Sequence, residues 1–222
     1  MKKAICKVLS TAVILQAAIT LTPSSASAEQ QGGTEQSVNS VQQTGEWEYR
    51  YVWSAFQKGW LYKYNDGTYA YGWKEINGEW YHFYTNTGVM STGWVKFAND
   101  TWQYFGDDGA QRRGLVTIDG KKYYFNNIGI RQTGMQTIDG QTYYFGSDGI
   151  MQTGWQTING QKYHFGSDGI MQTGWQYIGR VVEGDMYFSD TYYFGDDGVM
   201  RTGPQVIDGE KHEFDNDGAL LG

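Results

Sequence analysis

The chain has little of several things on which folded proteins commonly depend. Its 222 residues include one cysteine, Cys6, and two prolines, Pro23 and Pro204. A single cysteine excludes an intramolecular disulfide, and the chain after Cys6 has no thiol for metal binding or nucleophilic catalysis. The folded part must therefore be stabilised by packing, even if it is exported to an oxidising compartment.

Positive charge is also scarce. The sequence has 17 Lys and Arg against 24 Asp and Glu, which gives a net charge of −7. Affinity for nucleic acid depends mainly on neutralising phosphates with lysine and arginine, so the composition argues against a nucleic-acid partner. The same balance disfavours anionic lipid surfaces, whereas it attracts a cationic ligand.

The one apolar run, residues 8–21, lies near the N-terminus and is too short for a membrane span, which needs about 20 apolar residues. Lys2, Lys3 and Lys7 surround its start, and Ala26-Ser27-Ala28 follows it. This order is typical of a secretory signal peptide. We therefore predict a signal peptide over residues 1–28, secretion, and no membrane insertion.

Residues 29–45 consist mainly of Gln, Ser, Thr and Gly. Such a segment cannot bury enough apolar surface to offset the entropy lost on ordering. We predict a disordered linker over residues 29–45.

Glycine and aromatic residues, by contrast, are abundant and periodic. The chain has 31 glycines and 17% aromatic residues, and Gly114, Gly134, Gly154 and Gly174 are spaced by 20. Tyr123, Tyr143 and Tyr163 repeat at the same interval. Self-similarity at this period indicates an array of small stacked units.

One unit shows what is repeated. Asn159-Gly160 separates two short β-forming runs, 155–158 and 161–165. Both residues tolerate the positive φ of a type I′ turn, so the unit is predicted to be a β-hairpin. The predicted fold class is all-β, a solenoid of tandem hairpins of about 20 residues.

A two-residue turn also predicts register, with Ile158 opposite Gln161, Gln156 opposite Tyr163, and Trp155 opposite His164. Side chains alternate between the faces of a strand. We expect the face of Ile158, Tyr163 and Phe165 to form the stacking core. The other face, with Trp155, Lys162 and His164, is then the face on which a ligand would lie.

No catalytic arrangement is visible, and we predict no enzyme and no cofactor. His82, His164 and His212 lie far apart in sequence without cysteine partners, so no metal site is expected. Most acidic residues stand in Asp-Gly turns, which turn geometry explains. No paired-carboxylate cleft is expected from shallow repeats of this kind.

At these residues the sequence resembles the cell-wall-binding repeat family, which includes choline-binding repeats, glucan-binding repeats and the receptor-binding repeats of large clostridial toxins. The resemblance covers residues 51–221 and rests on Gly-Trp, Asn/Asp-Gly, Trp/Tyr-Tyr-Phe, Asp-Gly and Met-x-Thr-Gly-Trp in tandem. We expect a repeat array over residues 46–222. Residues 46–113 resemble choline-binding repeats, and residues 114–222 resemble toxin-type repeats with one long unit from Gly174 to Gly203.

The resemblance implies a non-catalytic protein bound to the bacterial cell wall or surface, with a choline-bearing or glycan wall polymer as its partner. In choline-binding repeats, aromatics of two successive hairpins form a cage. This implies a first cage of Trp73, Trp80 and Trp94, and a weaker second cage of Trp94, Trp102 and Tyr104. The alternative is that these tryptophans only pack one hairpin on the next.

In later units Lys122, Thr142 and Lys162 take the position of Trp80, so no choline site is expected between Gly114 and Gly174. The toxin-type resemblance instead implies a glycan site at the long unit, formed by Trp175, Tyr187, Tyr192 and Tyr193 beside His212. A lectin-like protein and a purely structural adhesin stalk therefore stay open as alternatives. Whether the chain forms a homodimer also stays open.

Overall fold

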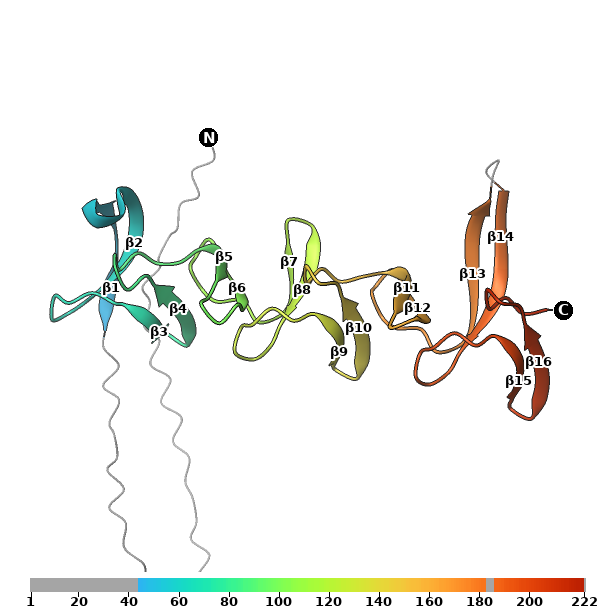
Figure 1. Ribbon diagram of the computed structural model, residues 1–222. Helices are drawn as coiled ribbons and strands as arrows, with labels where there is room; N and C mark the ends of the chain where they lie inside the picture. The colour runs from blue at the N-terminus through green and yellow to red at the C-terminus, as the bar shows by residue number, and fades with distance from the viewer. Residues whose placement is uncertain (1–43, 183–185, 222) are drawn as a thin grey trace, which may run out of the picture. The chain divides into compact units, whose positions relative to one another are not determined.

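The computed structural model describes residues 44–182 and 186–221, with side chains described except at residues 180–188 (Figure 1). The predicted signal peptide and all of the predicted linker except its last two residues lie outside these ranges. The described chain is all-β apart from one 3₁₀ turn, Trp53–Ala55. The predicted fold class is confirmed.

Strands that follow one another in the chain pair as antiparallel hairpins, each a two-stranded sheet of its own. The hairpins of the described chain are β1 (Gly45–Val52) with β2 (Gln57–Tyr64), β3 (Gly72–Ile76) with β4 (Glu79–Phe83), β5 (Gly93–Lys96) with β6 (Trp102–Phe105), β7 (Gly114–Ile118) with β8 (Lys121–Phe125), β9 (Gly134–Ile138) with β10 (Gln141–Phe145), β11 (Gly154–Ile158) with β12 (Gln161–Phe165), β13 (Gly174–Val182) with β14 (Met186–Phe194), and β15 (Gly203–Ile207) with β16 (Glu210–Phe214).

The turn and register predicted for residues 154–165 are confirmed. Asn159 and Gly160 have φ of 52° and 81°, as a type I′ turn requires. Ile158 lies opposite Gln161 and Trp155 lies opposite His164. The local sequence therefore sets the geometry of this hairpin.

A short connector follows each hairpin and ties it to the hairpin before. In the connector after β11–β12, for example, Met171 pairs with Phe165 and donates its N–H to the carbonyl of Thr142 in β10, at 2.8 Å. The corresponding bonds run from Met90 to Trp60, Gln111 to Trp80, Arg131 to Trp102, Met151 to Lys122, Met200 to Lys162 and Leu220 to Thr191. These bonds build the predicted solenoid.

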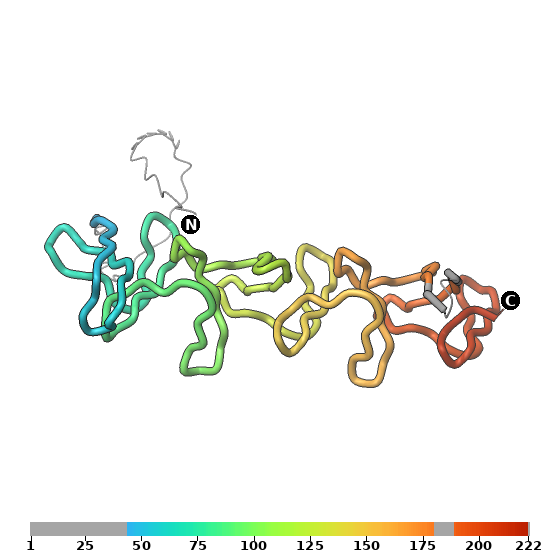
Figure 2. The backbone as a smooth tube through the Cα atoms, turned by 90° about the horizontal axis from the view of Figure 1, so that it is seen from above, coloured from blue at the N-terminus to red at the C-terminus, as the bar shows by residue number. Residues whose placement is uncertain are grey.

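The orientation of the hairpins within the array recurs. In Figure 1 the hairpins β1–β2, β7–β8 and β13–β14 extend to one side, and β3–β4, β9–β10 and β15–β16 to the opposite side. Seen from above in Figure 2, the hairpins β5–β6 and β11–β12 extend together to a further side. An orientation thus returns after every three hairpins.

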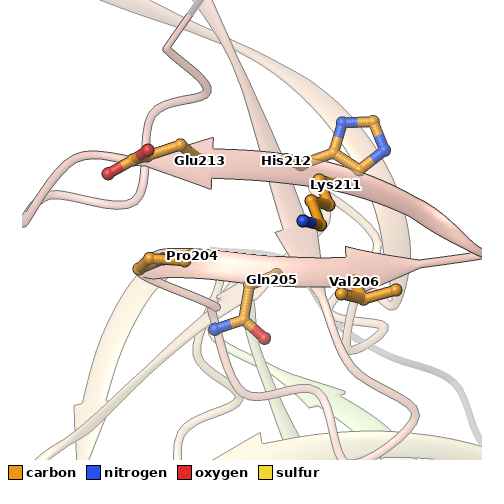
Figure 3. Close-up of a pocket in the computed structure, with 6 residues that line it drawn as sticks. All are labelled: Pro204, Gln205, Val206, Lys211, His212 and Glu213. Carbon is orange, nitrogen blue, oxygen red and sulfur yellow. The ribbon is translucent and has the colours of Figure 1, made fainter.

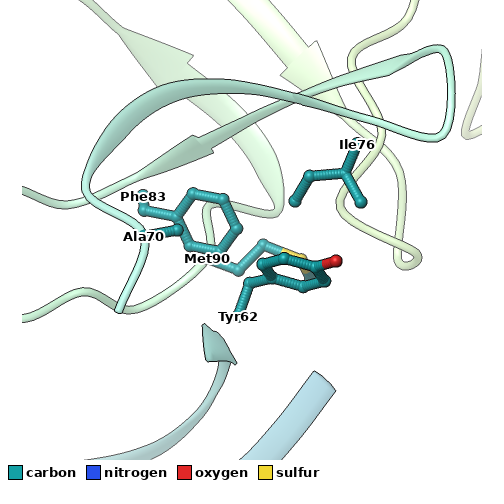
Figure 4. Packing of buried hydrophobic residues seen from close by; sticks show 5 residues of the cluster. All are labelled: Tyr62, Ala70, Ile76, Phe83 and Met90. Atoms are coloured by element: carbon teal, nitrogen blue, oxygen red, sulfur yellow. The ribbon is translucent and has the colours of Figure 1, made fainter. Parts of the chain in front are cut away.

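The core is a row of phenylalanines, one at the end of the second strand of most hairpins. The fully buried members are Phe83, Phe105, Phe125, Phe145, Phe165 and Phe194. Around Phe83, the side chains of Tyr62, Ala70, Ile76 and Met90 form one cluster (Figure 4). Because these residues come from two hairpins and their connectors, a single hairpin cannot bury its apolar surface alone.

The expected division into a core face and a ligand face does not hold completely. Phe165 is buried as expected, but Trp155 on the other face packs against Tyr192 and Phe194 of the next hairpin, at ring distances of 4.9 and 5.7 Å. The indole nevertheless stays 41% exposed. The face that carries Trp155 is thus partly packed and partly exposed to solvent, because the next hairpin lies against it.

Candidate ligand-binding interfaces

The same aromatic junction recurs between successive hairpins. A tryptophan that follows the first glycine of a hairpin contacts a ring across its own hairpin and the buried phenylalanine of the next hairpin. We name each junction after that residue: the Trp73, Trp94, Trp155 and Trp175 interfaces. Most of the candidate residues lie at these junctions.

The Trp73 interface joins hairpin β3–β4 to hairpin β5–β6. The rings of Trp73 and Trp80 lie 6.5 Å apart at an interplanar angle of 65°. Phe97 of the next hairpin stacks on Trp73 at 5.5 Å. Trp73 is 38% exposed and Trp80 is half-buried, so both present ring surface to solvent.

Trp94, predicted as the third wall of this cage, makes its ring contacts one interface further along. Phe97 takes the place that was expected for Trp94. It can do so because the turn of β5–β6 is longer than the turns of the neighbouring hairpins. Phe97 pairs with Thr101 around a three-residue loop in which Asp100 has φ of 67°. The only sequence signal for Phe97 was the extra residue in this turn.

One carboxylate shares the exposed face of the Trp73 interface. Glu75 lies directly opposite Trp80 in the hairpin and is exposed. Residues opposite each other in a hairpin project to the same face, so the carboxylate shares the face of the indole. The connector residue is neutral Gln111, whose amide donates to Gln103 and to the carbonyl of Ile128 and accepts from Nε of Arg113 at 3.1 Å. Two indoles beside a carboxylate can attract a cation.

The Trp94 interface joins hairpin β5–β6 to hairpin β7–β8 and contains the second predicted cage. Trp94 lies 6.3 Å from Trp102 and 5.1 Å from Tyr104, so the three predicted residues do lie together. Tyr123 of the next hairpin is 4.9 Å from Trp94. Sequence reasoning missed Tyr123, because hairpin register relates residues within one hairpin and Tyr123 belongs to the next. Burial raises the pKa of Tyr123, which keeps its phenol neutral.

The chain's own cations surround the Trp94 interface. The guanidinium carbon of Arg131 lies 6.0 Å from the ring centre of Trp94 and 5.9 Å from that of Trp102. Lys96, directly opposite Trp102, places its ammonium 5.9 Å from the same ring and also pairs with Asp100. The Trp73 and Trp94 interfaces thus each contain a pair of tryptophans, but the charged groups beside the two pairs differ.

The predicted glycan residues are divided between two interfaces. Trp175 lies 5.0 Å from Tyr193 and 4.9 Å from His212, as one group. Tyr192 is buried and belongs to the Trp155 interface instead. Neighbouring residues in a strand point to opposite faces, which separates Tyr192 from Tyr193. The side chain of Tyr187 lies outside the described residues.

Two cavities lie in the second half of the array. One of about 310 Å³ is lined by Trp155, Gln156, Thr157, Lys162, Tyr192 and Asp217. Across it, the ammonium of Lys162 pairs with the carboxylate of Asp217 at 3.2 Å. The other, of about 370 Å³, lies on β15–β16, where Pro204 follows the first glycine in place of a tryptophan (Figure 3).

The histidines lie at aromatic junctions. His82 is 5.2 Å from the ring of Trp73, and its Nδ1 lies 2.8 Å from the hydroxyl of Ser91. His164 is 5.1 Å from Trp155, and its Nδ1 is buried without a hydrogen-bond partner. Burial lowers the pKa of both histidines. Both rings are therefore held in the neutral form near pH 7.

No group of three or more histidine, cysteine, aspartate or glutamate side chains is placed to hold a metal ion in the part of the chain that the structure describes. Within residues 44–182 and 186–221, no helix has the length and apolar character that crossing a membrane would need.

The geometry defines a class of protein: a tandem array of aromatic hairpins whose predicted ligand-facing residues lie at the junctions. Sequence-family comparison agrees. The model described as "Choline-binding repeat" matches residues 70–113, 132–155 and 152–188. The model described as "Putative cell wall binding repeat" matches residues 114–130 and 189–200. Together the matches run almost without a gap from residue 70 to residue 200, and the chain belongs to the cell-wall-binding repeat family.

Solved structures share the fold. CbpJ from Streptococcus pneumoniae is 23% identical, with a TM-score of 0.66 over 80% of this chain and 64% of CbpJ. Choline binding protein F from Streptococcus pneumoniae, in the presence of a peptidoglycan analogue, is 27% identical, with a TM-score of 0.62 over 74% of this chain and 56% of that protein. The chain thus matches less than two thirds of the length of either protein. A search of curated protein sequences gave no match.

Proposed function

We propose that this protein is a non-catalytic surface-attachment protein that binds choline on a bacterial wall polymer at the Trp73 interface. The observation that supports this most is the grouping of Trp73, Trp80 and Phe97 beside Glu75. A quaternary ammonium is attracted by aromatic faces and by a nearby carboxylate, and it needs no hydrogen-bond donor or acceptor. The family of the chain and the likeness to choline binding protein F support the same ligand.

The size of the expected affinity follows from the rings. Each aromatic face contributes about 0.5–2 kcal/mol to binding of a cation. Two or three faces with an exposed carboxylate therefore give a dissociation constant of about 1 mM, which corresponds to about 4 kcal/mol. Attachment to a polymer would then depend on several contacts along the wall rather than on one tight site.

Calorimetric titration of the purified protein with choline tests the proposal. We expect saturable binding that Trp80→Ala weakens by about tenfold or more, because one wall of the site is lost. Trp80→Phe keeps an aromatic face and is expected to retain most of the affinity. Trp155→Phe, at an interface with no second tryptophan, is the control and should bind like wild type. Absence of choline binding by the wild-type protein would contradict the proposal.

Attachment to the bacterial wall itself is tested separately. A signal peptide, as predicted for residues 1–28, would export the protein to where the wall polymer is. Purified walls that carry choline should retain the protein, and free choline should release it. If walls stripped of choline retain it equally, or if the protein degrades the walls, the proposed partner or the non-catalytic role is wrong.

A second candidate, carbohydrate binding, is favoured by the cavity at the Trp155 interface. One exposed indole lies beside the amide of Gln156, the hydroxyl of Thr157 and the Lys162–Asp217 pair. A sugar needs a flat apolar face with hydrogen-bond donors and acceptors at its edge. Titration with neutral oligosaccharides tests this, and Trp155→Ala should abolish binding while leaving choline binding unchanged.

A further inference from the structure

We propose that Arg131 is a built-in occupant of the Trp94 interface, so that residue 131 decides which tryptophan pair is open to ligand. Its guanidinium takes the place that a quaternary ammonium takes at the Trp73 interface. This inference rests on the proposed function, because it concerns which interfaces bind choline.

The guanidinium stands over two indoles at once. Its carbon lies 6.0 and 5.9 Å from the ring centres of Trp94 and Trp102, which are themselves 6.3 Å apart. The three centres thus form a nearly equilateral triangle. These separations are at the outer range of about 6 Å over which a cation is attracted to an aromatic face. A second cation that approached both rings from the same side would meet the first.

The next connector holds the guanidinium in this position. Nη1 of Arg131 donates to the carbonyl of Asp148 at 2.6 Å, and Nη2 donates to the carbonyl of Ser147 at 3.4 Å. The Nε atom is buried without a hydrogen-bond partner. The stem of the side chain packs where Gly149 leaves space, since an added Cβ there would lie 2.5 Å from the Arg131 Cδ. The side chain is therefore packed between the indoles and the following turn.

A backbone hydrogen bond defines the connector position of Arg131, and the equivalent position in the other described connectors is not arginine. Each connector donates one N–H to the second strand of the preceding hairpin, and Arg131 makes this bond to Trp102 at 2.8 Å. The residues that make the same bond in the other described connectors are neutral: Met90, Gln111, Met151, Met171, Met200 and Leu220. At the Trp73 interface the residue is Gln111. One side chain thus changes the charge beside an otherwise similar tryptophan pair.

The residue opposite the second tryptophan adds to the difference. Glu75 lies opposite Trp80, whereas Lys96 lies opposite Trp102 and has its ammonium 5.9 Å from the ring. The Trp73 interface therefore attracts a cation, and the Trp94 interface repels one. Removing Arg131 leaves Lys96, which is paired with Asp100, so the opened interface keeps a partly neutralised neighbour.

The test uses a background in which the Trp73 interface is weakened. Choline is titrated calorimetrically into Trp80→Ala, into Trp80→Ala/Arg131→Gln, and into the latter with Trp102→Ala added. Glutamine is chosen because Gln111 stands at the same position one connector earlier. We expect the double variant to bind choline about tenfold more tightly than Trp80→Ala. Adding Trp102→Ala should remove this gain.

Matched controls separate charge from packing. Trp80→Ala/Arg131→Lys keeps a cation and should gain no binding, and Trp80→Ala/Met151→Gln makes a comparable change at a connector without tryptophans. If the Arg131→Gln background gains nothing while wild type binds choline, Arg131 only staples the turn at Ser147–Asp148 and the inference is wrong. Gain in the Met151→Gln control would overturn it equally.

A second measurement does not depend on choline. A double-mutant cycle between Arg131→Gln and Trp102→Leu compares free energies of unfolding in urea. A favourable coupling between the two residues is expected if the guanidinium occupies the indole pair, and zero coupling would overturn the inference. If wild type does not bind choline but the coupling between the two residues is favourable, only the proposed function is refuted.

Discussion

At the scale of single residues, two positions joined by one backbone hydrogen bond determine the chemistry of each interface. The residues whose carbonyls accept the connector bond are Trp60, Trp80, Trp102, Lys122, Thr142, Lys162 and Thr191. Their backbone geometry is the same, so the chain varies the ligand-facing group without changing the fold. Lys162 stands where the choline-type hairpins have a tryptophan. It pairs with Asp217 and helps to line a polar cavity.

The half-buried His82 and His164 give the first prediction, a loss of stability in mild acid. Their pKa values are lowered in the folded state, so the unfolded chain binds more protons once the pH falls below about 6.5, the ordinary histidine value. Stability is thus fully present above that pH and decreases as the pH falls toward the folded-state pKa. Urea unfolding at pH 7.5 and 5.5 measures the difference.

A matched substitution is available for this test. Tyrosine stands at the same strand position in neighbouring hairpins, at Tyr144 opposite Met135 and at Tyr193 opposite Trp175. His82→Tyr/His164→Tyr should therefore fold and should show a smaller loss of stability between the two pH values. An unchanged loss in the double variant would mean that the acidic side chains, and not these histidines, cause it.

Parts of the site could be predicted from the sequence and parts could not. The pairs Trp73 with Trp80 and Trp94 with Trp102 follow from hairpin register, which is local. Arg131 lies 5.9 Å from Trp102 only because a connector returns to the preceding hairpin, which no local rule gives. Its spacing of 20 from Met151 was nevertheless a signal that arginine takes a methionine position.

At the scale of elements, the turns define the hairpins and the glycines of the connectors define how they stack. Asp139-Gly140 forms a type I′ turn that faces open space, with nothing within 4 Å of an added Cβ on Gly140. Gly129, in a connector, has a similar φ of 79° but lies under Gln111, whose amide carbon would be 2.2 Å from an added Cβ. A comparison of the two glycines therefore distinguishes the cost of a side chain at positive φ from the cost of its clash with a neighbour.

This pair gives the second prediction. Gly140→Ala should cost about 1 kcal/mol of stability, the cost of a positive φ for a residue with a side chain. Gly129→Ala should cost about 2–4 kcal/mol, because Gln111 is held by hydrogen bonds to Gln103 and Ile128 and cannot move away freely. Urea unfolding of the two variants measures the difference, and equal costs would show that the packing under Gly129 is loose.

The elements themselves could be predicted because their signals are local. Asn159-Gly160 predicted the turn, the register and the alternation of faces, and all three are present. The assignment of the Trp155 face to ligand alone was incomplete, because that indole packs on Tyr192 and Phe194, more than 35 residues later. Local alternation says which residues share a face, but not what lies against that face.

At the scale of the whole array, each hairpin contacts mainly its neighbours in the chain. The connector bonds link a hairpin to the one before, and the Lys162–Asp217 pair reaches from β12 to the connector after β16. Stability in such an array is close to a sum of repeat and nearest-neighbour terms. Binding of a ligand at one interface should therefore stabilise that interface and leave distant hairpins nearly unchanged.

This gives the third prediction, local protection by choline in amide hydrogen exchange. At a choline concentration about 100 times the dissociation constant, the expected stabilisation is about 2.7 kcal/mol, or about hundredfold slower exchange for amides that open with the Trp73 interface. Protection should centre on residues 72–111 and be absent over 174–182 and 186–214. Trp80→Ala measured with the same choline is the control. Uniform slowing along the whole array would contradict the nearest-neighbour description, and protection confined to residues 94–131 would place the open site at the Trp94 interface instead.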